Sequence, residues 1–322
     1  MPLKKIFSKL NGLHYPQEFL CLVKESHTQP LQVYVATDGC IIKDITNLHL
    51  FVGYHPLIFA FASFNEVKFD STIQLVFSNA VLALNVVFVK KDALATIDMK
   101  ITKKQVVGNG MILYYEGING AHTFLTKFHQ YIQKLNNRLY NNKAGNVFLE
   151  DNLYKQVQIA YAVPRIISLI TVGKNNLFNL FPTDLHGQVN DTHYVISLRS
   201  AGKACEQVLL SGEMVISQMH CNQYKTVYSL GKNHMQELRP AEDLPLSLQL
   251  SKNLRLPLPE NTLSYHELIL EDAFVLGIHK IFLFRIAYQQ QLPGDKFTLA
   301  HIHNSYATWR YKNKLPGNYL HR

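Results

Sequence analysis

The chain has 322 residues, of which 47% are hydrophobic and 17% are charged, so a disordered or fibrous protein is excluded and one large or two ordinary globular domains are expected. Aromatic residues make up 11% of the sequence, a share that favours strands. The net charge of +9 and the pI near 9.2 favour an anionic ligand without choosing among nucleic acids, phosphates and acidic membranes, and a basic but inert surface explains them equally well.

The cysteines and the apolar runs bear on the compartment. The four cysteines form no CxxC pair and no Cys/His cluster of zinc-finger spacing, so reduced thiols and a cytoplasmic location are expected. The first 20 residues hold no apolar core typical of a secretory signal. The most apolar run, Ile73–Val89, is too short and too polar for a membrane span, so no membrane partner is expected.

The first half of the chain is rich in strand patterns. Runs of β-branched, aromatic and aliphatic residues predict four strands, at 31–37, 55–63, 80–89 and 111–120. Apolar residues then recur at spacings of four, four, three and four from Phe124 to Leu139. This period predicts a helix over 121–140, whose basic faces are either solvated or an anion-binding surface. Residues 141–146 are interpreted as a linker.

The second half returns to strand patterns. Residues 165–172 and 193–200 predict strands, 202–220 a short helix followed by a strand, and 263–289 two long strands. Four prolines between Arg239 and Asn261 predict an irregular connection with extended pieces. The remaining tail, 290–322, is polar and aromatic.

A short segment between the first two of these strands reads NLFPTDLHG, from Asn179 to Gly187. Pro182 and Gly187 exclude a regular helix or a central strand. Three apolar side chains that a solvated loop rarely needs lie within it, namely Leu180, Phe181 and Leu185. We therefore expect this loop to pack against the core alone or also against a ligand.

The two halves share a faint internal echo. In each, an apolar strand precedes a mixed loop, then a second strand (HPLIFAFAS or HYVISLRS), then a longer apolar run. The order of elements matches better than the residues do, and Gln74 would align with Gln207 and Ser78 with Ser211. Duplication is one interpretation, and the compositional similarity of β-rich sequences is the other.

No general catalytic signature is present. The sequence has no GxSxG, HExxH, P-loop, or GxGxxG followed by a helix. His301 and His303 have metal-like spacing on a strand, but no third ligand is evident nearby, so no metal site is expected. Basic and aromatic residues interleave in SYATWRYKNK, yet no RNP-type or helix-turn-helix pattern supports nucleic-acid binding, which is therefore not expected.

One stretch combines what a phosphate needs, namely backbone N–H groups, hydroxyls and a cation. It runs from Asn179 to Lys203 and supplies Thr183, Ser197, Arg199, Ser200, Gly202 and Lys203. An ordinary loop and strand end would explain the same residues, so both interpretations stay open.

From about Tyr154 to Arg322 the sequence resembles the flavin-reductase-like, FMN-binding split-barrel family. The resemblance is carried by the order of motifs rather than by any one of them. These are the strand start VPRIISLITV, the loop NLFPTDLHG, the strand YVISLR, GKAC with SGEMVISQ, and the late strand GIHKIFLFRI. Residues 1–150 are not covered, except through the internal echo.

The resemblance implies a small Greek-key barrel with FMN at a barrel–barrel interface and NAD(P)H as the reductant. It implies that FMN is bound by Asn179, Pro182, Thr183, Leu185, Ser197, Arg199, Gly202 and Lys203, and that His279 is the catalytic residue. Two positions depart from the family pattern. Its Asp-Thr after the lysine is Ala204–Cys205 here, which removes a phosphate hydroxyl, and its final Asn is Gln218.

These observations predict a mainly β protein: a split-barrel domain at 151–322 and a β-rich domain at 1–145 that ends in the helix over 121–140. The first domain is either a degenerate second barrel, whose Phe51, Tyr54 and His55 would then wall the flavin, or an unrelated β domain. The chain would form a homodimer or an intramolecular pseudo-dimer. We expect an FMN-dependent, NAD(P)H-using oxidoreductase, and the alternatives are a non-catalytic flavin or small-ligand binder, an interaction scaffold and an anionic-polymer binder.

Overall fold

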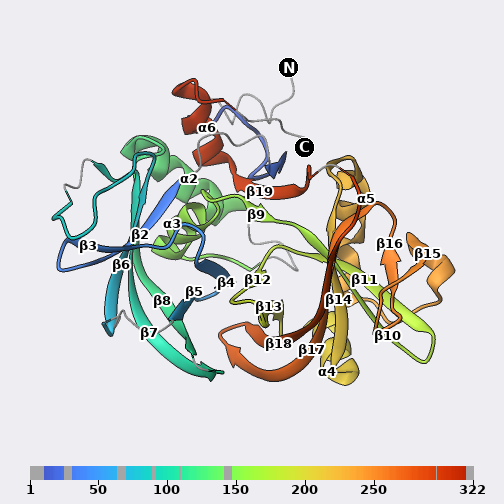
Figure 1. Cartoon of the computed structure of the whole chain (residues 1–322). Coiled ribbons are helices and arrows are strands. Elements are labelled where there is room, and N and C mark those ends of the chain that lie inside the picture. The colour runs from blue at the N-terminus through green and yellow to red at the C-terminus, as the bar shows by residue number, and fades with distance from the viewer. Residues whose placement is uncertain are drawn as a thin grey trace, which may run out of the picture.

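A computed structural model of the chain describes residues 11–24, 31–63, 70–88, 92–108, 110–140, 147–294 and 296–316. It is dominated by two seven-stranded antiparallel sheets, one from each half of the chain (Figure 1). The expectation of a mainly β protein is confirmed.

The first sheet has the strand order β3-β2-β6-β7-β8-β5-β4. Its strands are β2 (Gln32–Thr37), β3 (Cys40–Asp44), β4 (His49–Tyr54), β5 (Leu57–Ser63), β6 (Thr72–Ser78), β7 (Ala95–Val107) and β8 (Gly110–His122). Two helices follow it in the chain, α2 (Lys127–Tyr140) and α3 (Asp151–Ala160). Helix α3 packs on β8 at Gly117 and Gly120, where only the missing side chains leave room for Gln156.

The second sheet has the order β11-β10-β14-β17-β18-β13-β12. Its strands are β10 (Ser168–Lys174), β11 (Leu177–Thr183), β12 (His186–Gln188), β13 (His193–Arg199), β14 (Glu213–Met219), β17 (Thr262–Leu276) and β18 (His279–Gln291). Between them lie α4 (Lys203–Ser211), α5 (Tyr224–Ser229), the two-stranded pair β15 (Leu246–Leu250) and β16 (Pro257–Pro259), and the short 3-10 helices η3 (Cys221–Gln223), η4 (Leu230–Met235) and η5 (Ala241–Asp243).

A third, small sheet joins the two ends of the chain. Strand β1 (Phe19–Val23) pairs with β19 (Leu299–His303), which also pairs with β9 (Arg165–Ile166). Helix α6 (Asn304–Lys312) follows β19 directly. Leu20 and Leu22 of β1 share one apolar core with Ala300 and Ile302 of β19 and with the interior of the first sheet. Early and late parts of the sequence therefore fold into one unit.

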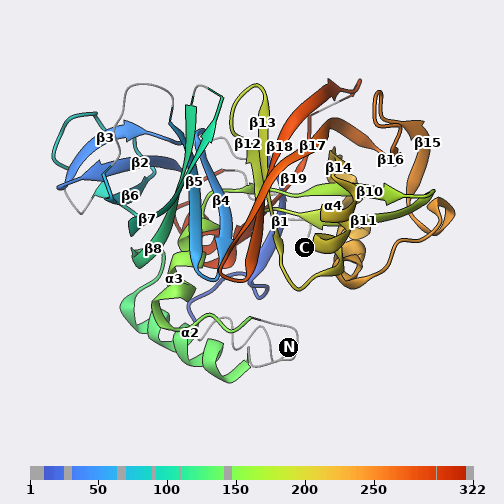
Figure 2. The ribbon, with the colours of Figure 1, turned by 90° about the horizontal axis from the view of Figure 1, so that it is seen from below.

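The two large sheets pack against each other through strands β4, β5 and β8 on one side and β13 and β18 on the other (Figure 2). This contact is apolar and fully buried. Its buried members are Val52, Ile58, Ala60, Val107, Ile112, Tyr114, Val195, Ile281 and Leu283. Within the described part of the chain, no helix is both long and apolar enough to cross a membrane.

The structure changes several details expected from the sequence. Residues 80–88 form no strand, because Ser78 ends β6 by accepting a hydrogen bond from the Ala80 N–H and the following apolar residues, such as Val81, are exposed. The helix expected from 121 begins at Lys127, since residues up to His122 complete β8. The linker at 141–146 lies outside the described residues.

Two further segments are more regular than expected. Asn179–Thr183 of NLFPTDLHG belongs to strand β11, which lies at the edge of its sheet, where a proline costs no ladder hydrogen bond. The aromatic tail, in turn, contains the strand β19 and the helix α6.

The close approach of the two halves can be tested at the turn between β17 and β18. Gly277 has a φ of +61°, and a Cβ there would collide with the carbonyl of His55 in the first half. Gly108 occupies the corresponding turn between β7 and β8 with a φ of +56° and open space around it. Both Gly→Ala changes incur the left-handed backbone cost of roughly 1–2 kcal/mol. We expect Gly277→Ala to lose a further 1–3 kcal/mol or so from overpacking.

Urea unfolding of the two variants measures this difference, with Gly108→Ala as the matched control. Equal losses of unfolding free energy would mean that the β4–β5 turn does not press on Gly277 in solution.

Candidate functional site

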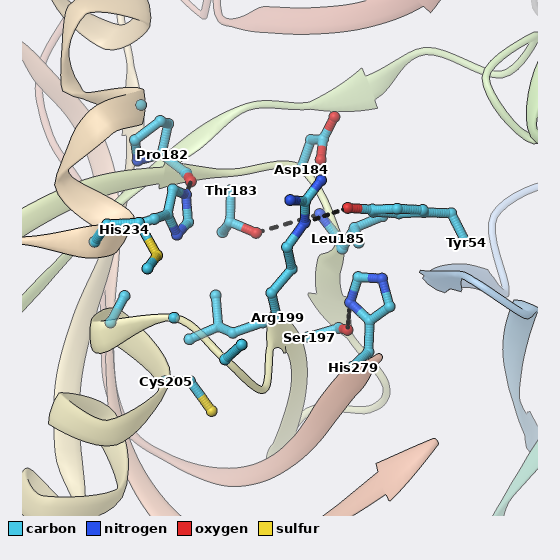
Figure 3. Close-up of a pocket in the computed structure, with 16 residues that line it drawn as sticks. Tyr54, Pro182, Thr183, Asp184, Leu185, Ser197, Arg199, Cys205, His234 and His279 are labelled. Atoms are coloured by element: carbon cyan, nitrogen blue, oxygen red, sulfur yellow. Dashed lines mark hydrogen bonds between the residues drawn. The ribbon is translucent and has the colours of Figure 1, made fainter. Parts of the chain in front are cut away.

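The candidate site is a cavity of about 590 Å³ where the ends of several strands meet (Figure 3). Strands β4, β11, β13 and β18, the first turn of α4 and the 3-10 helix η4 all contribute to it. The lining residues are Tyr54, Pro182, Thr183, Asp184, Leu185, Ser197, Leu198, Arg199, Ala201, Gly202, Ala204, Cys205, Gly231, His234, Met235 and His279.

The loop after β11 forms one wall, and it is fixed by hydrogen bonds on both sides. The Leu185 carbonyl accepts from the Ser197 N–H at 2.9 Å, which ties the loop to β13. His234 Nε2 donates to the Pro182 carbonyl at 2.7 Å. Burial lowers the pKa of His234, partly offset by this bond. The wall is therefore held in place by hydrogen bonds within the chain.

His279 lies at the start of β18, buried, with its Nδ1 3.2 Å from the Ser197 hydroxyl. Its Nε2 is buried and has no hydrogen-bond partner among the described residues, which is costly for an imidazole nitrogen unless a further group completes it. Burial, reinforced by the charge of Arg199, lowers the pKa of His279 to about 4. The ring is thus neutral near pH 7 and offers one unused nitrogen.

Arg199 ends β13 and brings a cation to the cavity. Its Nε donates to the hydroxyl of Tyr54, and its guanidinium carbon lies 5.5 Å from the centre of that ring. Figure 3 shows the side chain rising between Thr183 and Tyr54. Tyr54 also meets His279 edge-on, with ring centroids 4.5 Å apart. Burial raises the pKa of Tyr54, so its hydroxyl stays protonated.

The first turn of α4 forms the opposite wall. Gly202 is its N-cap, with no side-chain hydrogen bond to the helix end, and Ala204 and Cys205 follow along the lining. Helix N-termini carry partial positive charge and favour anions. Burial raises the pKa of Cys205, so this thiol is not an activated nucleophile.

The structure gathers most of the residues expected from the sequence in this cavity. Seven of the nine line it, namely Pro182, Thr183, Leu185, Ser197, Arg199, Gly202 and His279. Asn179 and Lys203 do not. Buried Asn179 donates to Gln207 and to the Asn233 carbonyl, a structural role. Lys203 points outward and pairs with Glu237 at 2.9 Å.

Of the aromatic and histidine residues expected from the first half, Tyr54 alone is in the lining, whereas Phe51 is buried in the core of the first half. Among the lining residues missed by sequence reasoning, two are titratable, Asp184 and His234. Asp184 stands within NLFPTDLHG and could have been found there, but His234 lies 51 residues from Thr183 and no pattern connects them.

Asp184 also takes part in a partly buried chain of hydrogen bonds. His301 Nδ1 donates to its carboxylate at 2.6 Å, and the Tyr161 hydroxyl donates to the same oxygen at 2.9 Å. His301 Nε2 lies 2.7 Å from the Tyr228 hydroxyl. Burial would raise the pKa of Asp184, but the bond from His301 holds it below its usual value. His301 is therefore a carboxylate partner, and the described residues contain no group of three or more possible metal ligands.

Comparison with known proteins gives similarities of structure only. No model of a protein family matches the chain, and no curated protein matches it in sequence. The NADH:FAD oxidoreductase SgcE6 of Streptomyces globisporus C-1027 is similar at a TM-score of 0.42 and 14% identity, over 51% of this chain and 95% of that one. An FMN-binding protein of Thermus thermophilus is similar at 0.36 and 14%, over 44% and 87%.

The styrene monooxygenase flavin reductase of Pseudomonas putida S12 is similar at a TM-score of 0.36 and 15% identity, over 42% of this chain and 87% of that one. The resemblance expected from the sequence motifs is thus also found among solved structures of flavin reductases and FMN-binding proteins. Since the TM-scores are below 0.5 and the identities below 25%, these matches assign no function to this chain.

The buried, neutral His279 predicts a pH dependence of stability. Its pKa is about 4 in the folded chain against 6.5 for the free side chain. Between these values the unfolded chain binds a proton that the folded chain does not, so stability falls as the pH drops from about 6.5 toward 4 and is constant above. We expect His279→Gln to lose less stability over this interval than the wild type, by on the order of 1 kcal/mol per pH unit.

Chemical denaturation at several pH values measures this slope. His129→Gln on α2, outside the cavity lining, is the matched control. Parallel slopes for the wild type and His279→Gln would show that His279 titrates normally in the folded chain.

Proposed function

We propose that the cavity binds FMN and that the chain is a flavin-reductase-like oxidoreductase, acting in the cytoplasm, that uses NAD(P)H as reductant. The observation that carries this proposal is the convergence of a cation, a helix N-terminus and a neutral imidazole with a free nitrogen on one cavity. The cavity volume of about 590 Å³ lies within the range of roughly 300–1,000 Å³ typical of small-molecule sites. The ordered sequence motifs supply the flavin as the specific ligand.

The residues present fit such a ligand. An anionic phosphate matches the Arg199 guanidinium and the N-terminal turn of α4 at Gly202. A planar ring system with polar edges matches the aromatic face of Tyr54, the apolar Leu185 and the unpaired Nε2 of His279. The hydroxyl lost at Ala204–Cys205 leaves the phosphate to Arg199, Thr183 and the backbone, which predicts modest affinity.

Bound flavin would supply the hydride-accepting chemistry, which no side chain in the cavity offers. The chain would contribute binding, orientation and electrostatics. His279, neutral at physiological pH, would hydrogen-bond a ring edge without adding a charge, and it is the candidate catalytic residue. Arg199, exposed at the end of β13, would place a fixed positive charge beside the ligand.

A second candidate is a non-catalytic flavin or small-ligand binder. It is favoured by Ala204–Cys205, which lack the phosphate-binding hydroxyl of the family pattern. Oxidation of NADH or NADPH by the purified chain with added FMN separates the two. We expect absorbance at 340 nm to fall in proportion to enzyme concentration, well above the rate with FMN alone. Perturbation of the flavin spectrum without turnover would favour the binder.

The contribution of Arg199 to binding gives a further prediction. Arg199→Gln removes the cation of the cavity and should weaken FMN binding about tenfold, which corresponds to a charge-assisted hydrogen bond of about 1.4 kcal/mol. Arg285→Gln is the matched control, since Arg285 lies on β18 outside the cavity and faces Glu271. Fluorescence titration with FMN measures both. Equal affinities for the two variants would contradict the placement of the phosphate beside Arg199.

A further inference from the structure

The long hairpins of the two halves correspond residue by residue. Every pair of β7 and β8, from Ala95 with His122 to Val107 with Gly110, becomes a pair of β17 and β18 when 169 is added to both numbers. The correspondence includes both β-bulges, which follow Asp98 and Ile101 in one hairpin and Glu267 and Leu270 in the other. Bulges are specific features of a strand pair, so their double coincidence is not a matter of β composition.

The neighbouring strands extend the correspondence. Strands β5 and β13 pair with equivalent residues of β8 and β18 at a constant shift of 135, so Ala62 matches Ser197. Strands β6 and β14 do so at a shift of 141, so Gln74 matches Val215. The sequence echo therefore had the right order of elements, but its alignment of Gln74 with Gln207, which lies on α4, is wrong.

The contacts between the halves are reciprocal, as a twofold axis requires. Gln105 of β7 donates to Asp272 of β17 at 2.7 Å. The residues equivalent to these two, Phe274 and Lys103, also meet, with the Lys103 ammonium 4.4 Å from the Phe274 ring. The side-chain types differ between these two contacts, but the same two strand positions meet in both.

Two polar groups of the cavity, His279 and Ser197, correspond to residues without a polar side chain in the first half. His279 corresponds to Gly110, and Ser197 corresponds to Ala62. The change of shift from 135 to 141 means that the first half has six fewer residues between Ser63 and Thr72 than the second half has between Leu198 and Glu213. The eight residues left there are too few for the nine-residue helix α4 and its connections.

The two equivalent hairpin turns differ in their contact with the opposite half. At the cavity, the Ile278 N–H donates to the His55 carbonyl at 3.1 Å, which brings the β4–β5 turn and Tyr54 against the β17–β18 turn. Gly108, the equivalent of Gly277, has no atom within 4 Å of the position of a Cβ. The first half therefore contacts the second at the β17–β18 turn, beside the cavity.

We propose that the chain is an internal dimer of two copies of one barrel, in which one of the two twofold-related sites is complete and the other has been lost. The first half then serves the remaining site by supplying Tyr54, which positions Arg199. One chain is a self-contained unit that binds one flavin, a stoichiometry that rests on the proposed function. The twofold architecture rests on strand register and contacts alone.

The test combines the mass of the full-length protein in solution with the number of FMN molecules bound per chain. Light scattering during gel filtration should give the mass of one chain, 36.9 kDa, with and without FMN. Titration followed by flavin fluorescence should saturate at one FMN per chain. Tyr54→Ala should weaken binding at least tenfold, whereas Tyr131→Ala, an exposed tyrosine on α2, should leave it unchanged.

Each result tests a different part of the proposal. Two FMN molecules per chain would overturn the loss of the second site, and a mass of two chains would overturn the self-contained unit. Unchanged binding in Tyr54→Ala would overturn the role of the first half. If no FMN binds at any concentration, the proposed function and the one-flavin stoichiometry fail together. The mass would still show whether one chain forms the two-barrel unit without a second copy.

Discussion

The structure depends on the apolar contact between two long, bulged hairpins, β7–β8 and β17–β18, and the strands beside them. Each sheet has a second face that water would otherwise reach, and residues such as Tyr114 and Ile281 make that face apolar. The two faces cover each other, which removes the surface from water at roughly 25 cal/mol per Å². The bulges increase the local twist of the strands. As a result, strand ends of the two halves lie next to each other around the cavity.

The cavity follows from this contact. Because Tyr54 ends β4 and His279 begins β18, the packing of those strands puts a side chain of the first half against the site of the second. The surrounding burial then sets the protonation states. His279 and His234 have lowered pKa values and Cys205 a raised one, which leaves Arg199 and the Asp184 carboxylate as the charged groups of the lining. Because the Asp184 carboxylate is bound to His301 and Tyr161, Arg199 is the cation left for a ligand. Such a cavity suits a ligand that brings its own chemistry, which accounts for the lack of any catalytic motif in the sequence.

The sequence predicted the strands best where side chains alternate or run apolar over many residues, as in 263–289, because burial on a sheet face imposes that pattern. It failed where tertiary contacts decide. Residues 80–88 have strand composition but meet β3 through an isolated bridge of Val87 with Cys40 rather than a ladder. The apparent loop at Asn179 pairs as an edge strand, where a proline is tolerated. The contiguous part of the site, 182–202, could be read from motifs, whereas Tyr54 and His234 are joined to it only by folding.

The duplication was hard to see because the features that define it are carried by the backbone. Register, bulges and a two-residue turn survive many side-chain changes, provided that a glycine stands at the turn and apolar residues keep their alternation. Gly108 and Gly277 satisfy this, and so do the apolar positions around Tyr114 and Leu283, although their identities differ. The first half is also six residues shorter than the second at the position of α4, so one ungapped alignment cannot match the strands on both sides of it. The helix that hides the repeat in sequence is therefore the same element that distinguishes the half with a site from the half without one.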